Sequence, residues 1–391
     1  MKNATLGTRL IPAVIAATLL SSCNTPLPSA APTDTVSPAA PAAAVHSSML
    51  LEGVELRPGI TVDVNVREYV NEDRPCQGGT LSGLAVHGVT ANARNWEPFA
   101  EALFHGHGPR LCRLFAVDLP GHGDSGLPRG GLLFGDLLLD DYVTTVLAVL
   151  DHLHSRNVRP GLLVGHSQGT LVLMMAQRRL LDQGSSLYHR YGARHMAMLG
   201  PVPPADVPWS MAELAAATVP QFITSSTELG VHAAATAEEW LFLWFSNASG
   251  TLATTAPSPT AVIDNGWNDP EPLLALMQLV GVAPLHKPSV PAGAFAPDMG
   301  TTLQVVIFAD DIWSPAPDGI AIYQHLTGDV THAGFVSIAS DVPGNAVHGM
   351  YASEPERVVA ALCVIACRAE PPAGAEACAR LRTAMRSRAR C

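Results

Sequence analysis

The chain has 391 residues, of which 48% are hydrophobic and 15% are charged. This composition is typical of a globular protein that buries a sizeable core and excludes a largely disordered chain. The formal net charge is −11. Because binding to nucleic acid depends on clustered Lys and Arg side chains, this acidic balance argues against a nucleic-acid partner.

The first residues have the pattern of an export signal. Lys2 and Arg9 form a positively charged region before an apolar run over residues 10–20, which is too short to cross a bilayer. The run ends in Leu-Ser-Ser-Cys23, which resembles the lipobox of bacterial lipoproteins, where the cysteine is acylated. We therefore expect a signal peptide over residues 1–22 and a lipid anchor on Cys23. Cleavage of an ordinary secretory signal nearby is the alternative.

The residues after Cys23 bear on location. Asn24 follows the cysteine, whereas in the lipoprotein family an aspartate there favours retention in the inner membrane. We therefore expect a protein of the bacterial cell envelope, attached to the outer rather than the inner membrane, or otherwise exported. Residues 23–48 are rich in Pro, Ala, Ser and Thr, which predicts a flexible tether that cannot bury a core.

The remainder of the chain alternates between short apolar runs and longer stretches with helical spacing. Residues 54–69 alternate apolar and polar side chains, which predicts antiparallel opening strands. Strands that alternate with helices predict an α/β fold with a doubly wound, mostly parallel sheet covered on both faces. Strands are expected at residues 81–89, 113–119, 161–165, 195–200, 303–309 and 335–339, and helices at residues 96–104, 137–154, 168–181 and 354–366.

Residues 204–300 break this alternation and predict a lid or cap inserted into the core, which comprises residues 49–203 and 301–368. The insertion contains several Trp and Phe residues, which indicate either an apolar pocket for an acyl or alkyl group or the insertion's own small core. Residues 369–391 form a C-terminal tail that contains cysteines and arginines.

Six cysteines accompany Cys23, an even number that favours disulfides in an exported protein. Cys76 and Cys112 each lie shortly before a predicted strand of the same sheet. If those strands are neighbours, the two cysteines meet at one edge and can form a disulfide. The other four are expected to connect the tail to the last helix rather than to bind a metal: Cys363, Cys367, Cys378 and Cys391.

The run Gly165-His166-Ser167-Gln168-Gly169 matches the pattern G-x-S-x-G. An apolar strand precedes the run and a helical pattern follows it, as a nucleophile elbow requires. The turn is so tight that small residues must flank the serine, and the helix N-terminus behind it favours developing negative charge. The motif therefore predicts that Ser167 is a catalytic nucleophile.

A serine hydroxyl needs a general base, and the base needs an acid that orients it. After the strand at residues 303–309 come Asp310 and Asp311, and near the C-terminus comes His348. Both positions lie in loops after strands, where a doubly wound sheet places its chemistry. His332 is the other histidine of this region, but it lies before the last strand.

These motifs resemble the α/β-hydrolase fold family, and the resemblance extends over residues 54–367. It implies that Asp311 is the acid, because Pro315 follows it at the family's spacing, with Asp310 as the alternative. The matching pieces are His87-Gly88-Val89, Trp96, Asp118 to Gly123 with Ser125, Gly165 to Gly169, Asp311 with Pro315, and His348.

The resemblance also implies roles for the other site residues. His348 is the general base, with His332 as the alternative. The backbone N–H groups of Val89 and Gln168 form the oxyanion hole. His122 and Ser125 belong to a recurrent turn and are expected to be structural.

Together these residues predict a serine hydrolase that cleaves a small-molecule carboxylic ester through an acyl-enzyme, without a cofactor or metal. Acyl transfer, C–C bond hydrolysis and perhydrolysis use the same triad and remain alternatives. A third class is a non-catalytic lipoprotein of hydrolase fold, which the intact set of Ser167, Asp311 and His348 disfavours. A serine at this position also disfavours epoxide hydrolysis and dehalogenation, because the family uses aspartate there.

Overall fold

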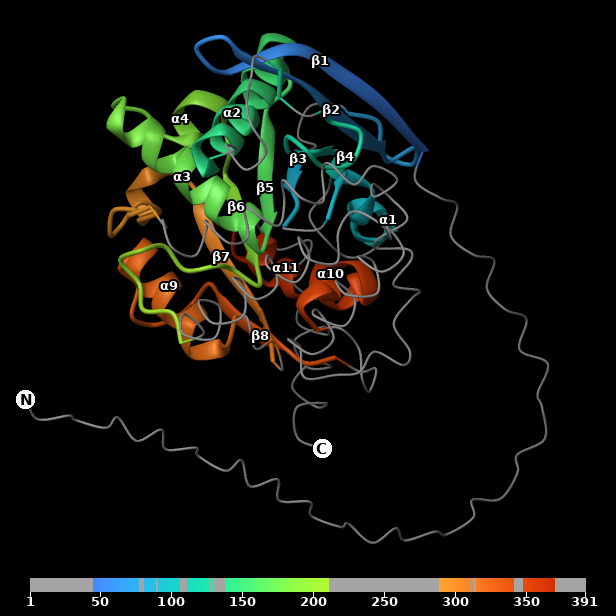
Figure 1. Cartoon of the computed structure of the whole chain (residues 1–391). Helices are drawn as coiled ribbons and strands as arrows, with labels where there is room; N and C mark the ends of the chain where they lie inside the picture. Colours follow the sequence, from blue (N-terminus) through green and yellow to red (C-terminus); the bar gives the residue numbers. More distant parts are fainter. Residues whose placement is uncertain are drawn as a thin grey trace, which may run out of the picture. The chain divides into compact units, whose positions relative to one another are not determined.

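The computed structural model describes residues 45–76, 81–88, 91–105, 111–126, 128–129, 138–210, 288–309, 311, 314–340 and 347–369. These residues form an eight-stranded sheet with the order β1-β2-β4-β3-β5-β6-β7-β8 (Figure 1). Strand β2 pairs antiparallel with β1 and with β4, and the remaining neighbours pair parallel. The predicted α/β fold with a mostly parallel sheet is confirmed.

Helices separate the parallel strands along the chain (Figure 1). The strands are β1 Val45–Arg57, β2 Ile60–Val70, β3 Leu81–Val86, β4 Leu111–Val117, β5 Pro160–His166, β6 His195–Leu199, β7 Thr302–Phe308 and β8 Phe335–Ile338. The helices are α1 Glu97–His105, α2 Leu139–Ser155, α3 Gln168–Asp182, α4 Leu187–Tyr191, α9 Ala316–Thr327, α10 Met350–Ser353 and α11 Pro355–Ala369, and the short 3₁₀ turns are η1 Ala93–Trp96, η3 Pro297–Met299 and η4 Val347–Gly349.

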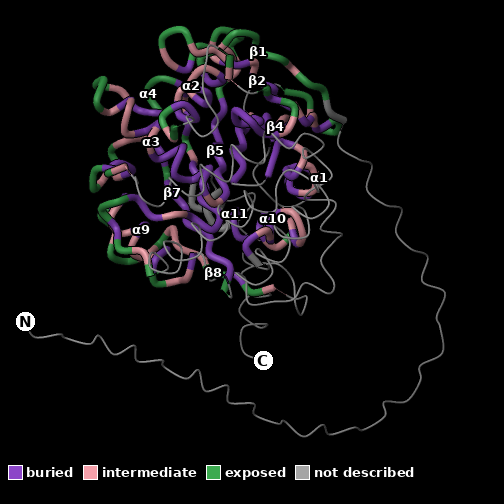
Figure 2. The backbone as a smooth tube through the Cα atoms, in the orientation of Figure 1, coloured by how far each residue is buried: buried purple, intermediate pink, exposed green. Residues whose placement is uncertain are grey.

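Alternate residues of the central strands face opposite layers of helices. On β5, Leu163 packs in the layer of α2, α3, α4 and α9, whereas Leu162 and Val164 pack in the layer of α1, α10 and α11. Figure 2 shows the buried strands between these two layers. Full burial of one such aliphatic side chain stabilises the fold by about 1.5–3 kcal/mol. The two layers hold the sheet rigid, and its strand ends therefore present loops in fixed positions.

Strand β1 and helix α9 differ from the sequence-based expectation, and the short helices α4 and α10 were not expected either. Strand β1 begins at Val45, inside the predicted tether, because its backbone pairs with β2 from Val45 opposite Val70 onwards. Backbone pairing of this kind does not depend on side-chain composition. Helix α9 was not expected, although Pro315 precedes it and Gly328, with φ of +72°, ends it. These are the usual start and stop residues of a helix.

The two ends of the predicted insertion lie side by side on the core. Ala205 N–H donates to the carbonyl of Pro288 (3.1 Å), and Asp206 accepts from Val290 N–H (2.8 Å). Residues 288–300 pack on α3 and α9, since Gln177 donates to the carbonyl of Ala294 (2.7 Å) and Val290 and Phe295 are buried in the core. The structure therefore joins this stretch to the core. Residues 211–287, with the expected apolar pocket, lie outside the described residues.

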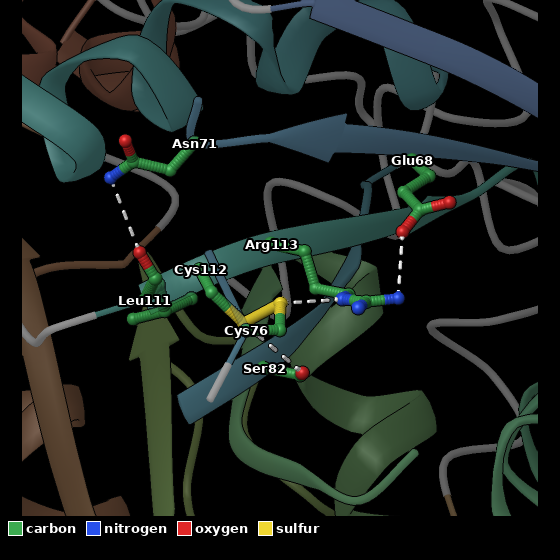
Figure 3. Close-up of a disulfide and its surroundings, with 7 residues drawn as sticks. All are labelled: Glu68, Asn71, Cys76, Ser82, Leu111, Cys112 and Arg113. Carbon is green, nitrogen blue, oxygen red and sulfur yellow. Dashed lines mark hydrogen bonds and ion pairs between the residues drawn. A yellow bond between two sulfur atoms is a disulfide. The ribbon is translucent and has the colours of Figure 1, made fainter. Parts of the chain in front are cut away.

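A disulfide joins Cys76 to Cys112, with a Cα–Cα distance of 5.1 Å (Figure 3). Strands β3 and β4 are parallel neighbours, as the pairing requires, although Cys112 is the second residue of β4 rather than a residue before it. Arg113 lies beside the bridge, donating from Nε to Cys76 Sγ (2.9 Å) and pairing with Glu68 (3.1 Å). The sequence separation is 36. Closing a loop of that length in the unfolded chain stabilises the fold by about 2–4 kcal/mol.

The expected lipid anchor and C-terminal staples cannot be placed. Residues 1–44, with Cys23, and residues 370–391, with Cys378 and Cys391, lie outside the described residues, as do the side chains of Cys363 and Cys367. Within the described ranges, no helix combines the length and hydrophobicity that a membrane span needs.

Candidate active site

Ser167 occupies a strained position between β5 and α3. Its backbone has φ of +50° and ψ of −120°, a conformation that L-residues other than glycine rarely adopt. Such a conformation costs of the order of 1–3 kcal/mol. It is held in part by the Ser167 N–H, which donates to the carbonyl of Leu199 at the end of β6 (2.9 Å). The serine is therefore presented at the carboxyl edge of the sheet and is not fully buried.

The flanking glycines make this turn sterically feasible. A Cβ atom on Gly165 would lie 2.8 Å from the carbonyl oxygen of Gly169, and one on Gly169 would lie 2.3 Å from the carbonyl oxygen of Val86. Both distances are far shorter than any real Cβ contact. The small residues that the motif requires are thus imposed by the backbone of β3 and of the elbow itself.

His348 and Asp311 form a buried pair. His348 Nδ1 lies 2.7 Å from Asp311 Oδ2, and the two residues are only 6% and 2% exposed. Asp311 follows β7, and His348 lies in η4, after β8. A carboxylate on Nδ1 leaves Nε2 free of the proton and holds the ring in one orientation. The pair can therefore accept a proton at Nε2 and stabilise the resulting positive charge.

Gly200 connects this pair to the elbow. It follows Leu199, which accepts the hydrogen bond of the Ser167 N–H. A Cβ atom on Gly200 would lie 3.2 Å from Asp311 Oδ2 and 3.3 Å from His348 Cε1, and its φ of +51° also favours glycine. The end of β6 thus touches the serine turn on one side and the Asp311–His348 pair on the other.

The alternative site residues lie in different surroundings from the preferred ones, or outside the described residues. His332 has its Nε2 2.6 Å from Gln324 Nε2 on α9, whereas His348 is the histidine that contacts Asp311. Asp310 and Val89, one of the two expected oxyanion donors, lie outside the described residues. Gln168, the other donor, is the first residue of α3. The N–H groups of a first helical turn have no partner within the helix, which suits them to an oxyanion.

His87, just after β3, is held by hydrogen bonds to two backbone groups. Its Nε2 accepts from the N–H of Leu119 (3.0 Å), so its Nδ1 carries the proton and donates to the carbonyl of Gly88 (2.7 Å). Burial lowers the pKa of His87 to about 4. A Cβ atom on Gly88 would lie 2.8 Å from that of Ser167, so Gly88 lies directly beside this serine.

The turn after β4 is held by its own polar groups. Ser125 Oγ donates to the carbonyl of Asp118 (2.8 Å) and accepts from the N–H of Asn65 (2.8 Å). His122 Nδ1 lies 3.1 Å from the carbonyl of Pro120. These hydrogen bonds of Ser125 and His122 are thus with the backbone of the turn and of β2, as expected for a structural role.

Two residues of this site were not predicted from the sequence: His166 and Gly200. His166 Nε2 lies 2.6 Å from the carbonyl oxygen of His348. No local pattern signals a contact between residues so far apart in the chain. Among the side chains that the structure describes, no group of three or more His, Cys, Asp or Glu is arranged to hold a metal ion.

Comparison with known proteins assigns the family. A model of the alpha/beta hydrolase family matches residues 84–362. The chain belongs to the α/β-hydrolase family. Curated relatives of this α/β-hydrolase include the 2-succinyl-6-hydroxy-2,4-cyclohexadiene-1-carboxylate synthases of Salmonella newport and Salmonella typhi, which are 38% and 37% identical over 103 residues. That match covers 26% of this chain and 34% of each relative, so the α/β-hydrolase spans about a third of their length.

Solved structures share the fold. Homoserine O-acetyltransferase from Staphylococcus aureus superimposes with a TM-score of 0.56 at 14% identity, over 82% of this α/β-hydrolase and 95% of that chain. A thermophilic esterase from Thermogutta terrifontis superimposes with a TM-score of 0.53 at 15% identity, over 82% and 98% of the two chains. At these identities the likeness extends to the fold and not to the substrate.

The buried histidines predict acid sensitivity of the fold. Burial, and secondarily the neighbouring His87, lowers the pKa of His122 to about 3, and the two rings lie 4.9 Å apart. An unfolded histidine titrates near 6.5. Between these values the unfolded chain binds more protons, so the free energy of unfolding falls as the pH falls below about 6.5, by up to roughly 1.4 kcal/mol per pH unit for each histidine.

Urea unfolding between pH 7 and pH 5 measures this dependence. We expect the His122→Phe variant to lose less stability on acidification than the unchanged chain, because one titrating group is gone. The buried carboxyl of Asp118 is present in both chains and cancels in the comparison. Parallel stability curves for the two chains would rule out His122 as a source of acid sensitivity.

Proposed function

We propose that this α/β-hydrolase cleaves carboxylic esters of small molecules through an acyl-enzyme on Ser167. The observation that carries the proposal is the hydrogen bond between His348 Nδ1 and Asp311 Oδ2 (2.7 Å), beside a serine held in a strained turn at the head of α3. A base, an orienting acid and a nucleophile in this arrangement are the requirements for acyl transfer to serine.

The proposed reaction has two halves. His348 Nε2 takes the proton of Ser167 Oγ while the oxygen attacks the ester carbonyl carbon. The N–H of Gln168, with that of Val89, stabilises the oxyanion, and His348 then returns the proton to the departing alcohol. Water next attacks the acyl-enzyme with His348 again as the base, which releases the acid and restores Ser167. Asp311 keeps Nε2 directed at the reacting groups in both halves.

A second candidate uses the same residues for a different reaction. The curated relatives are synthases whose named product carries a carboxylate and a succinyl group. The relative from Salmonella newport is 38% identical over 103 residues. This likeness favours, as a second candidate, a reaction at a carbon–carbon bond of a carboxylate-bearing substrate. In that case Ser167 and His348 stay essential while simple esters are not turned over.

We also propose that the protein works in the bacterial cell envelope, anchored through Cys23. The Cys76–Cys112 disulfide supports export, because such bonds form and persist in oxidising compartments. The small residues before Cys23 support lipidation.

A series of p-nitrophenyl esters with acyl chains of increasing length tests the reaction. Ser167→Ala is expected to lower kcat by about 10⁶-fold, and Asp311→Asn by about 10⁴-fold. Asp310→Asn is the matched control for Asp311→Asn and should keep near-normal kcat. His348→Gln should be inactive, whereas its matched control His332→Gln should keep near-normal kcat. Ester turnover that survives in Ser167→Ala would contradict the proposal. Inactivity of the unchanged chain on every ester would favour the second candidate.

Fractionation of bacterial cells tests the anchor. The unchanged chain should sediment with membranes, and Cys23→Ala should appear in the soluble fraction. Equal membrane association of the two chains would exclude lipidation at Cys23.

A further inference from the structure

We propose that His166 is a positioning residue that holds the general base against the nucleophile. The inference rests on the proposed function of Ser167 and His348 and concerns the residue just before the serine. His166 is the last residue of β5 and is only 5% exposed. Its side chain contacts the segment that carries His348, which comes 182 residues later in the chain.

The hydrogen bond of His166 sets its protonation. Nε2 lies 2.6 Å from the carbonyl oxygen of His348. A carbonyl can only accept, so Nε2 carries the hydrogen and Nδ1 is the bare nitrogen of a neutral ring. Nδ1 is buried, and no residue in the described part of the chain forms a hydrogen bond with it. Its neighbour is Gly88, on which a Cβ atom would lie 3.0 Å from this nitrogen.

Ring contacts hold His166 in this orientation. The ring centroid of His166 lies 4.8 Å from that of His348 and 4.5 Å from that of Tyr351. Tyr351 in turn packs on Trp96, with centroids 4.5 Å apart. These rings come from η1, β5, η4 and α10, and those of Trp96 and Tyr351 are almost completely buried. The ring of His166, at the end of β5, thereby packs against side chains of both η4 and α10.

The electrostatics of the site keep His166 neutral. Burial, and secondarily the neighbouring His348, hold the pKa of His166 well below its usual range. In the proposed reaction His348 becomes positively charged. A neutral His166 adds no like charge next to it, and its hydrogen bond to the His348 carbonyl is kept throughout the cycle. His166 is thus suited to fix the position of His348 without competing for its proton.

The consequence is a short mechanical link between base and nucleophile. One peptide bond separates His166 from Ser167, so a hydrogen bond from His166 to the backbone of His348 sets the separation of the two reacting side chains. Displacement of a catalytic group by about 1 Å can cost about 10²-fold in rate. Loss of this bond should therefore lower kcat and leave KM nearly unchanged.

A matched pair of variants isolates the bond. Gln and Met have the same length, but only Gln carries a donor that reaches the His348 carbonyl. We expect His166→Met to lower kcat, and the rate of inactivation by a fluorophosphonate, by about 10²-fold, and His166→Gln to recover most of that loss. Both rates are expressed per folded molecule, and thermal unfolding is measured alongside. Equal rates for the two variants, or losses that follow only the thermal midpoint, would overturn the proposal.

A measurement on the unchanged chain keeps the proposal testable if both variants fail to fold. Histidine ¹⁵N shifts should show His166 as a neutral ring with the hydrogen on Nε2 from pH 5 to pH 8. A proton on Nδ1, or titration of His166 in that range, would exclude the bond described. Failure of the proposed function is separate, because then Ser167 itself would not react with the fluorophosphonate.

Discussion

The backbone conformation of Ser167 is the constraint on which the rest of the site depends. A φ of +50° at a residue other than glycine persists only where its surroundings hold it. Here the close packing of Gly165 and Gly169 on the neighbouring backbone, and the N–H bond to Leu199, provide that support. The hydroxyl can then stand at the sheet edge with the start of α3 behind it. The strain is maintained by the many apolar contacts of the two helical layers.

The parallel sheet explains why distant residues meet at this edge. The loops after β3, β6, β7 and β8 supply His87, Gly200, Asp311 and His348 to the elbow after β5. Each loop follows the carboxyl end of a parallel strand, so all of them lie on one side of the sheet. The buried rings of His87 and His166 there bond to backbone carbonyls and N–H groups. The geometry of the Asp311–His348 pair is therefore coupled to the backbone of several strands at once.

Local sequence patterns predicted much of this fold and site. The nucleophile elbow could be predicted because the strand, the two glycines and the helix around Ser167 are contiguous in the sequence. The Cys76–Cys112 bridge followed from strand positions alone, once β3 and β4 are neighbours. The start of β1 at Val45 could not be predicted in this way, because pairing with β2, and not the composition of the segment, determines where the strand begins. Helix α9 has a proline before it and a glycine after it, but its apolar residues recur with only a weak helical spacing.

Contacts between distant segments required the fold. The choice of His348 over His332 depends on which ring reaches Asp311, a distance that sequence spacing does not encode. The contact of His166 with the His348 carbonyl has no sequence signal, since the histidine stands at a position of the motif that accepts many residues.

The roles proposed for the other site residues all require that Ser167 is reactive. Intact-mass and peptide analysis after reaction with a fluorophosphonate tests this claim most directly: a single adduct on Ser167, absent from His348→Gln, is the predicted result, and a full-length folded chain without an adduct, or with the adduct on another residue, would contradict it.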